Sequence, residues 1–489
     1  MPKLTIHRGN VSRTLTFEGA PVLGSLLGAE LQRPCGGRGV CGKCAVSLQG
    51  AVSQPNEAEL RAGTRLACQA VQLGDAEATL PEEVRLEQIE TSGGISISAA
   101  DPMPGRLGAA VDIGTTTLAL RLYELKSGEL LGEAVLRNPQ TSVAADVMGR
   151  IGAALNGALP ALQAQVLQAV QSLLGEACDQ AGRSAKEVDA LVVAGNTTML
   201  YLLTGRSPES LTRAPFEADC LFGTVLRLLD RTCFLTPCMN AFVSADITCA
   251  LLDSGLWRSD GIALLCDVGT NGEIALWKRD ELFVTSTAAG PAFEGAGISC
   301  GCSSVRGAID RAWVEDGTLR IHTIGEAKAC GICGSGLIDV IAAALQLGWI
   351  DETGAMIENS IPLANEVALL PKDVRAVQLA KAAIAAGIET LLETAGVHSS
   401  DVEALYIAGG FGNHLNVNSA AAIGLIPDGL ASRVHCIGNA SLAGAARLLL
   451  DQSAAEDARF IADQAKHVSL GGNPRFNEHY IDQMLFPDP

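Results

Sequence analysis

The sequence predicts an α/β protein in which a small β-rich domain precedes a larger domain of two lobes. Its 489 residues are enough for roughly three domains of about 150 residues each. Apolar residues make up 48% of the chain but aromatic residues only 4%, and 53 residues are glycine. This composition is typical of α/β cores built from small aliphatic side chains and joined by tight turns. Two similar Asp-x-Gly-Thr turns about 155 residues apart indicate an internal duplication, with one α/β lobe each.

The N-terminal domain is predicted from its strand pattern. Residues 3–8 and 13–18 alternate in polarity on either side of a Gly-Asn turn, as the two strands of a hairpin do. Pro21 opens a helical segment that extends to about residue 32. After a loop rich in Gly and Cys, residues 45–49 and 65–73 are strand-like. This order predicts a β-grasp-like domain.

Composition marks the domain boundaries. Residues 91–108 are rich in Gly, Ser and Pro and are predicted to form a linker. Beyond it, short apolar strands that end in Gly/Thr turns alternate with long Ala/Leu-rich helices such as 160–178 and 374–396. We therefore expect a first domain over residues 1–90, the linker over 91–108, and a two-lobed domain over 109–489.

The charge of the chain excludes two classes of partner. The formal net charge is −19, so the chain repels nucleic acids and anionic membrane surfaces. It lacks the uncharged apolar run of about 18 residues that a membrane-spanning helix needs, and its N-terminus lacks the apolar stretch of a signal peptide. We expect a cytoplasmic protein, in which 15 cysteines are better explained by metal binding than by disulfides.

Four cysteines have the spacing of an iron–sulfur ligand set. Cys35, Cys41, Cys44 and Cys68 form the pattern C-x5-C-x2-C-x23-C, in which one glycine-rich loop supplies three thiolates. A 2Fe–2S cluster is held by four thiolates, and glycines let the loop wrap it and bring N–H groups towards its sulfur atoms. Over about 85 residues the chain resembles the 2Fe–2S ferredoxins, although the first gap is one residue longer than in the plant-type spacing.

Other metal or phosphate sites fit the cysteine loop less well. Zinc motifs usually pair two C-x2-4-C knuckles, and only one such pair is present in this loop. Residues 37–44 nearly match a Walker A loop, but Cys44 replaces the Ser or Thr that binds magnesium. Two interpretations stay open for four other cysteines, namely Cys300, Cys302, Cys330 and Cys333. They could form a second tetra-thiolate site, or each could be a small buried residue of the core.

Two aspartate turns are the predicted phosphate-binding elements. Asp112 begins the sequence DIGTTT between two apolar strands, and Asp267 begins DVGTNGE in the same setting. Such a turn presents N–H groups and hydroxyls to a phosphate, and an aspartate at a strand end reaches magnesium or its water shell. Together the turns could clamp a triphosphate between two lobes. The other residues predicted to contact the nucleotide here are Gly114, Thr115, Thr116, Thr117, Gly269, Thr270 and Asn271.

A third glycine turn and a helix complete the predicted nucleotide site. Gly409, Gly410 and Phe411 follow a strand, where a Gly-Gly turn lets the backbone approach a base or ribose. In this order the three turns resemble the phosphate-1, phosphate-2 and adenosine motifs of the actin, sugar-kinase and acetate-kinase superfamily, which has a ribonuclease H-like fold and binds ATP with Mg²⁺. The resemblance makes Asp246, in AFVSADITCALL, a candidate to orient the attacking water. An N-cap or a solvated helix residue explains Asp246 equally well.

The pairing of these domains resembles one family, the reductive activators of corrinoid proteins. The resemblance covers nearly the whole chain and rests on CGGRGVCGKC, DIGTTT, DVGTNGEIAL, GICGSGLIDV, IAGGFGNHLN and IGNASLAGAA. It implies an ATP-hydrolysing iron–sulfur oxidoreductase of anaerobic metabolism. Such a protein uses an external electron donor to return inactive cob(II)alamin to cob(I)alamin in the corrinoid protein of a methyltransferase system. Some members carry an extra domain where this chain has only the linker, so a homodimer is left open.

Three other functions stay open from the sequence. An activator of another low-potential enzyme, such as a 2-hydroxyacyl-CoA dehydratase, shares the ATPase fold but uses a 4Fe–4S cluster bridged between subunits. A small-molecule kinase with a fused redox sensor would release a phosphorylated product. A ferredoxin whose ATPase-like lobes only dock a partner would not turn over nucleotide.

Overall fold

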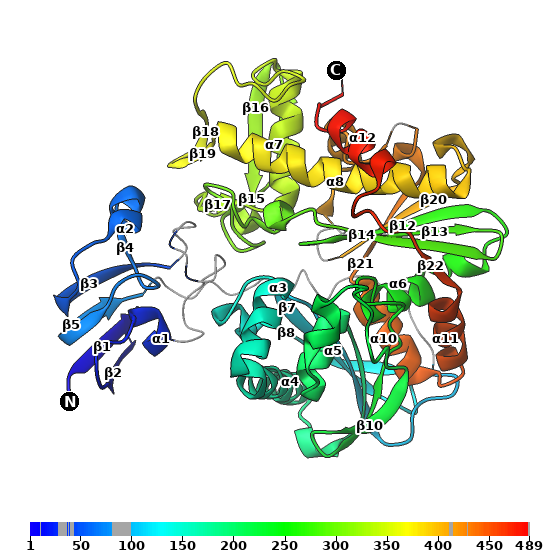
Figure 1. Ribbon diagram of the computed structural model, residues 1–489, viewed down its shortest axis with the longest axis horizontal. Coiled ribbons are helices and arrows are strands. Elements are labelled where there is room, and N and C mark those ends of the chain that lie inside the picture. The colour runs from blue at the N-terminus through cyan, green and yellow to red at the C-terminus, as the bar shows by residue number, and fades with distance from the viewer. Residues whose placement is uncertain are drawn as a thin grey trace. The chain divides into compact units, whose positions relative to one another are not determined.

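The computed structural model describes most of the chain, namely residues 1–9, 11–27, 37, 39, 44–80, 99–409, 414–427 and 429–487. These residues belong to two compact units (Figure 1). The first unit comprises Met1–Arg85, Arg137–Ala169 and Tyr201–Thr212, and the second comprises Leu86–Leu136, Val170–Leu200 and Arg213–Pro489. No helix in the described part of the chain has both the length and the apolar character needed to cross a membrane.

The N-terminal residues form a five-stranded sheet in the order β2-β1-β5-β3-β4. Its strands are β1 (Lys3–Arg8), β2 (Val11–Thr16), β3 (Ala45–Val52), β4 (Arg65–Leu66) and β5 (Gln72–Thr79). Strands β1 and β2 pair antiparallel across the predicted turn, whereas β1 and β5 pair parallel. Leu4 and Ile6 of β1 pack with Leu23 and Leu27 of helix α1 (Leu23–Leu27) in a small core. The alternating pattern therefore predicts the hairpin correctly.

The single strand predicted over residues 65–73 is wrong. The chain forms β4 and then a turn, in which the N–H groups of Gln69 and Ala70 both donate to the carbonyl oxygen of Leu66. Helix α2 (Glu57–Ala62) explains the break, because its buried Glu59 accepts hydrogen bonds from the Arg65 side chain and the Leu66 N–H. Cys68 therefore lies in a turn. The predicted helix from Pro21 is described only as α1, and its continuation to residue 32 lies outside the described residues.

The first lobe of the second unit is built on a six-stranded sheet in the order β10-β11-β9-β6-β7-β8. Its strands are β6 (Leu107–Ile113), β7 (Thr117–Glu124), β8 (Glu129–Arg137), β9 (Val188–Gly195), β10 (Thr224–Leu228) and β11 (Arg231–Leu235). An antiparallel hairpin, β6 with β7, is followed by strands β9 and β11, which add parallel to it. Apart from Asp112, every residue of β6 is buried, as expected for a central strand.

The second lobe repeats this sheet in the order β21-β20-β12-β13-β14-β22. Its strands are β12 (Ile262–Val268), β13 (Gly272–Lys278), β14 (Glu281–Thr287), β20 (Ala404–Ala408), β21 (Val434–Gly438) and β22 (Ala465–His467). The repeat extends to the register of single residues. Asp112 of β6 lies opposite Ala194 of the parallel strand β9, and Asp267 of β12 lies opposite Ala408 of the parallel strand β20. The sheets thus have the duplicated arrangement that the two aspartate turns predict.

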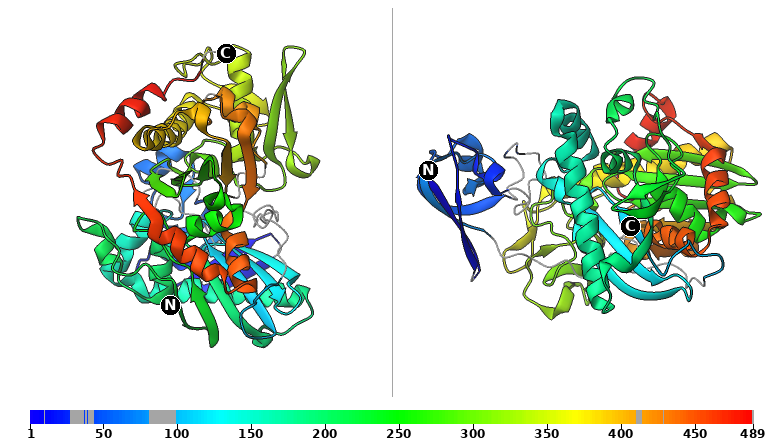
Figure 2. Two further views of the ribbon diagram at one scale, coloured as in Figure 1. Left: turned by 90° about the vertical axis from the view of Figure 1, so that its right-hand side faces the viewer. Right: turned by 90° about the horizontal axis from the view of Figure 1, so that it is seen from below.

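Helices α6 (Ala245–Ser254) and α10 (Ala440–Leu450) lie between the two sheets (Figure 1; Figure 2). They pack against each other, and one buried core joins them to residues of both sheets. Their contact depends on a glycine, because a Cβ atom on Gly444 of α10 would lie 2.1 Å from the carbonyl oxygen of Cys249 in α6. The layer carries functional side chains at the N-terminal ends of both helices.

The other elements lie beside the second sheet or elsewhere within the two units. Helix α8 (Pro371–Ala395) packs on β13 and β14, and its bounds are close to the predicted 374–396. A smaller sheet, β16-β15-β17, lies beside helix α7. The bounds of these and the remaining elements are α3 (Val147–Ala153), α4 (Leu159–Gln180), α5 (Thr197–Thr204), β15 (Ala308–Glu315), β16 (Thr318–Thr323), β17 (Gly331–Ile332), α7 (Gly334–Gln346), β18 (Ile361–Ala364), β19 (Val367–Leu369), α9 (Val417–Ala422), α11 (Ala454–Gln464) and α12 (Pro474–Asp482).

Candidate functional site

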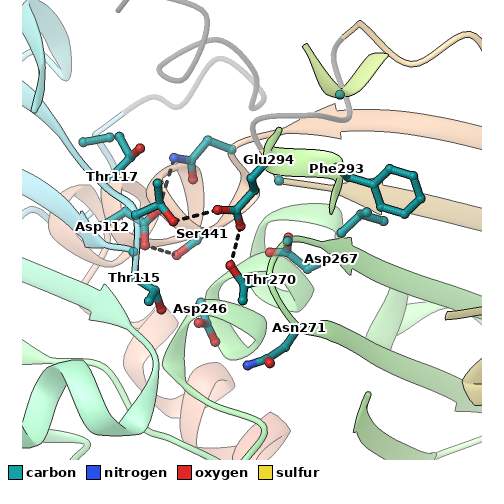
Figure 3. A pocket seen from close by; sticks show the side chains of 18 of the residues that line it. Asp112, Thr115, Thr117, Asp246, Asp267, Thr270, Asn271, Phe293, Glu294 and Ser441 are labelled. Atoms are coloured by element: carbon teal, nitrogen blue, oxygen red, sulfur yellow. Dashed lines mark hydrogen bonds between the residues drawn. The ribbon is translucent and has the colours of Figure 1, made fainter. Parts of the chain in front are cut away.

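The two aspartate turns face one cavity of about 260 Å³ in the second unit (Figure 3). This arrangement follows from the duplicated sheets, because β6 and β12 end at equivalent positions and each is followed by its turn. Every predicted nucleotide residue in the described part of the chain lines the cavity. These residues are Asp112, Gly114, Thr115, Thr116, Thr117, Asp246, Asp267, Gly269, Thr270, Asn271 and Gly409. Gly410 and Phe411 lie outside the described residues.

Asp112 is held in place by the start of helix α10. Ser441 donates from Oγ to Asp112 Oδ1 over 2.8 Å, and Asn439 donates from Nδ2 to Asp112 Oδ2 over 3.2 Å. Burial raises the pKa of Asp112 above its ordinary value, and the two hydrogen bonds oppose that rise. Asn439 also caps α10 through its Oδ1, which accepts from the N–H of Leu442. The N-terminal end of α10 therefore fixes the position of the first aspartate.

Asp267 occupies the equivalent position in the second turn. Burial raises its pKa to about 7, and the nearby charges of Asp112 and Glu294 add to the rise. Gly409 packs so closely that a Cβ atom there would lie 2.6 Å from Asp267 Oδ1. In the described residues this glycine closely approaches the second aspartate, and its predicted approach to a nucleotide base or ribose stays a prediction.

Asp246 lies in the first turn of α6. The N-cap position belongs to Ser244, whose hydroxyl pairs with Thr197 Oγ1 over 2.9 Å, so Asp246 is not the helix cap. Burial, together with the charges of Asp267 and Asp112, raises the pKa of Asp246 to about 7. The side chain lines the same cavity as both turn aspartates (Figure 3). This position is compatible with the predicted water-orienting role, which stays a prediction.

Two further carboxylates in the cavity were not assigned a role from the sequence. Glu294 accepts from Thr116 Oγ1 over 2.6 Å and from Thr270 Oγ1 over 2.7 Å, so it joins the two turns (Figure 3). Glu273 accepts from Ser286 over 3.3 Å, and burial raises its pKa well above the ordinary value. Glu273 is part of the second aspartate motif, whereas Glu294 belongs to no motif. The only local signal for Glu294 is the nearby glycines Gly290 and Gly295, which indicate a constrained turn.

The cavity is acidic and can take a polyanion only together with cations. Five carboxylates line it, and no Lys or Arg is present among the described residues that do so. Those residues also hold no group of three or more His, Cys, Asp or Glu side chains arranged to bind a metal ion. Magnesium is usually held by one or two carboxylates together with phosphate oxygens and water. The cavity therefore suits a magnesium–nucleotide complex better than a free metal ion.

The described residues bring together two of the four predicted cluster ligands. Cys44 and Cys68 are buried in the N-terminal core, and the hydrogen bond from Cys44 lowers the pKa of Cys68 to about 6 against the opposing effect of burial. The backbone N–H of Gly39 and the side-chain amide of Gln69 also point at the Cys68 sulfur, the amide from 3.6 Å. Cys35 and Cys41 lie outside the described residues.

The possible second tetra-thiolate site is not supported by the described residues, which include all four of its cysteines and hold no group of side chains arranged to bind a metal ion. Cys330 instead contacts the carbonyl oxygen of Arg306, and Cys333 contacts that of Ile309. Cys302 lines the cavity next to Ser303 and Ser304. Hydrogen bonding to the backbone and ordinary packing account for these residues.

Two protein-family models match the chain from residue 107 to residue 489, apart from residue 260. Residues 261–489 match the family described as the C-terminal domain of RACo, the ASKHA domain. Residues 107–259 match the family described as the RACo middle region. ASKHA denotes the fold of the actins and the sugar and acetate kinases, so the predicted actin-like fold is confirmed for this part of the chain.

Similar individual proteins share one theme in their names. The corrinoid activation enzyme RamQ of Eubacterium limosum is 34% identical over 419 residues, which cover 78% of this chain and 70% of RamQ. A Co(II) methylated amine-specific corrinoid protein reductase of Methanosarcina barkeri is 26% identical over 421 residues, covering 78% and 77% of the two chains. A solved structure of a reductive activator for a corrinoid, iron–sulfur protein superposes with a TM-score of 0.73 at 25% identity, covering 100% of this chain and 98% of that one.

Proposed function

The chain belongs to the family of corrinoid activation enzymes, and on that premise we propose that it reduces an inactive corrinoid protein at the expense of ATP. The reaction is the one-electron reduction of cob(II)alamin to cob(I)alamin in a methyltransferase system. The observation that carries the proposal is the cavity, where the turns of two duplicated lobes present Asp112 and Asp267 to a common space. The names of the similar proteins favour a corrinoid partner over a dehydratase.

The N-terminal domain is proposed to be a β-grasp ferredoxin domain with a 2Fe–2S cluster on Cys35, Cys41, Cys44 and Cys68. The described residues fit such a group, because two thiols lie side by side and N–H donors point at one of them. A bound cluster would supply one electron at a time at low potential. The turn through Cys68 holds that thiol next to Cys44, and Gln69 ties it to the glycine loop through the carbonyl oxygen of Gly37 at 2.5 Å.

ATP with Mg²⁺ is proposed to bind between the two turns. Thr115, Thr116 and Thr270 offer hydroxyls and the turns offer N–H groups to the phosphates. Asp112 and Asp267 would hold magnesium or its water shell, which offsets the charge of the phosphates. Asp246 would orient the attacking water from the start of α6. Gly409 and its neighbours Gly410 and Phe411 are proposed to face the adenosine.

An energy source is needed because the electron transfer is uphill. Cob(I)alamin is a strong reductant, and one electron moved against a deficit of ~100 mV requires roughly 2.3 kcal/mol. Binding and hydrolysis of ATP between two lobes can drive a domain closure that supplies this free energy. Asp112 and Asp267 lie in different lobes but line one cavity. Such a closure would therefore change the distance between the two groups that contact the nucleotide.

The experiment that tests the function combines full-length protein, a corrinoid protein in the cob(II) state, a chemical reductant, magnesium and ATP. Absorbance should show loss of cob(II) and gain of cob(I) only when all components are present. Cys41→Ser should keep ATP hydrolysis but abolish the reduction, and Asp112→Ala should keep the cluster spectrum but abolish both. Reduction at an equal rate without ATP, in a partner that the reductant alone cannot reduce, would show that the lobes have no energetic role.

A further inference from the structure

Glu294 contacts both of the aspartate turns that line the cavity. It ends the short 3-10 helix Pro291–Glu294 that follows β14. Its carboxylate accepts from Thr116 of the first turn with Oε2 and from Thr270 of the second turn with Oε1, over 2.6 and 2.7 Å. These hydroxyls belong to turns 178 and 24 residues away from Glu294 in the sequence. One carboxylate therefore bridges the two motifs proposed to hold the phosphates.

The bridge shows that one oxyanion can be reached by hydroxyls from both turns at once. A carboxylate and a phosphate both present oxygen acceptors a short distance apart, and both take charge-assisted hydrogen bonds from hydroxyl donors. Each of the Thr116 and Thr270 hydroxyls has one hydrogen, so it cannot donate a full hydrogen bond to the carboxylate and to a phosphate at the same time. An incoming phosphate at this place must therefore displace Glu294, and the like charges of the two groups oppose their coexistence.

We propose that Glu294 occupies the place of the terminal phosphate of the nucleotide, and that it thereby determines how strongly the site prefers a triphosphate to a diphosphate. This inference rests on the proposed function, because it assumes that the two turns bind nucleotide. A diphosphate can enter while the bridge persists, whereas a triphosphate must break it. Loss of the terminal phosphate lets Glu294 return and join the two turns again.

The neighbours of Glu294 locate the bridge at the reacting end of the nucleotide. Its carboxylate lines the same cavity as Asp267 and as Asp246, the candidate for orienting water. Figure 3 shows Glu294 between the two turns, with Asp246 and Asp267 in the same cavity. A phosphate in the place of the Glu294 carboxylate would thus share the cavity with the residue expected to orient the attacking water.

Release of the bridge requires only movement of a side chain. Phe293, the preceding residue, is 3% exposed and packs in the core of the second lobe, so it anchors the backbone. Gly295, the following residue, has a positive φ of 75° and lies against the backbone of Cys302, where a Cβ atom would approach to 2.5 Å. Glu294 itself is only half-buried. The backbone is fixed on both sides, so the carboxylate can leave the two threonine hydroxyls by rotation of the side chain alone.

Glu294→Ala and Glu294→Gln in the full-length chain test the inference, with Glu315→Gln, at the exposed end of strand β15, as the matched control. Isothermal titration with a non-hydrolysable ATP analogue and with ADP, both with magnesium, gives the affinities. We expect Glu294→Ala to bind the analogue at least tenfold more tightly and ADP within twofold of the unmodified chain. The affinities of Glu294→Gln should change in the same direction, because this variant removes the charge but keeps the side-chain volume. Thermal unfolding of each variant reports whether it folds.

Each other outcome would overturn a defined part of the inference. Unchanged or weaker binding of the analogue would mean that Glu294 assists the nucleotide, and the inference would fail while the proposed function stands. An equal gain for the analogue and ADP would place the bridge at an inner phosphate and overturn the assignment to the terminal one. Absence of binding by the unmodified chain to either nucleotide would overturn the proposed function together with the inference.

Discussion

The substitution Gly444→Ala should loosen the layer of helices that supports the cavity. The three atoms nearest to the added methyl group are the O, C and Cα atoms of Cys249, at 2.1, 2.5 and 2.6 Å, whereas ordinary contact begins at 3.4 Å. All three belong to the backbone of α6, so no side-chain rotation can relieve the clash and the helices must separate by about 1 Å. Overpacking of a core typically costs about 1–3 kcal/mol, and the better helix propensity of alanine returns about 1 kcal/mol.

We therefore expect a net loss of about 2 kcal/mol at the upper end of that range, which corresponds to a fall in Tm of roughly 2–3 °C for a unit as large as the second one. Differential scanning calorimetry measures the shift. Binding of the ATP analogue should weaken as well, because α10 holds Asp112 and α6 carries Asp246.

Two glycines serve as graded controls for this prediction. Gly175 in α4 has no atom within 4 Å of the added methyl group, so Gly175→Ala should raise the stability by about 0.5–1 kcal/mol. Gly387 in α8 meets only the side-chain tips of Ile274 and Thr287, each at 2.6 Å, which can rotate, so its alanine variant should fall between the other two. A Gly444→Ala protein that unfolds at or above the temperature of the unmodified chain would refute the reasoning.

Three further predictions concern the site. The affinity for the magnesium–ATP analogue should rise between about pH 6 and 8, because burial and neighbouring charges raise the pKa of Asp246 and Asp267 to about 7 and both side chains act as carboxylates. The Tm of the nucleotide-free chain should fall as the pH rises from about 4 to 7, where the folded state still holds protons that the unfolded state has released; opposite signs in titrations and scans would contradict this. Ser441→Ala removes a hydrogen bond to a half-buried carboxylate, so analogue binding should weaken about tenfold, and an unchanged affinity would count against the placement of magnesium. Cys68→Ser should lose most of the iron measured in anaerobically purified protein, whereas Cys436→Ser, on the exposed part of β21, should retain it.

Local patterns predicted the fold well. The N-terminal hairpin and the long helices α4 and α8 were expected within a few residues of their observed bounds, because each depends on periodicity over neighbouring residues. The strand over residues 65–73 failed because a buried carboxylate from another element, Glu59, interrupts it. A contact of this kind has no signature within the strand itself.

The site could be predicted as far as it depends on strand–turn sequences. Asp112 and Asp267 were found because each follows an apolar strand and precedes Gly and Thr. The residues that position them were not assigned, since Ser441 reaches Asp112 across 329 positions and Glu294 reaches Thr116 across 178. Such pairings are set by the packing of α10 and the duplicated sheets, which no local pattern contains.

The duplication of the two sheets has a consequence for the direction in which ATP would bind as proposed. Two equivalent half-sites would offer the same surroundings at both ends, yet ATP has a base at one end and a phosphate at the other. The direction of binding must therefore be encoded where the halves differ. Glu273 stands opposite Asp267 where Ala119 stands opposite Asp112, and the insertion carrying α7 brings Gly334 and Ser335 to the cavity from the second half alone. The differences at these few positions would determine which end of the cavity binds the base and which end binds the phosphates.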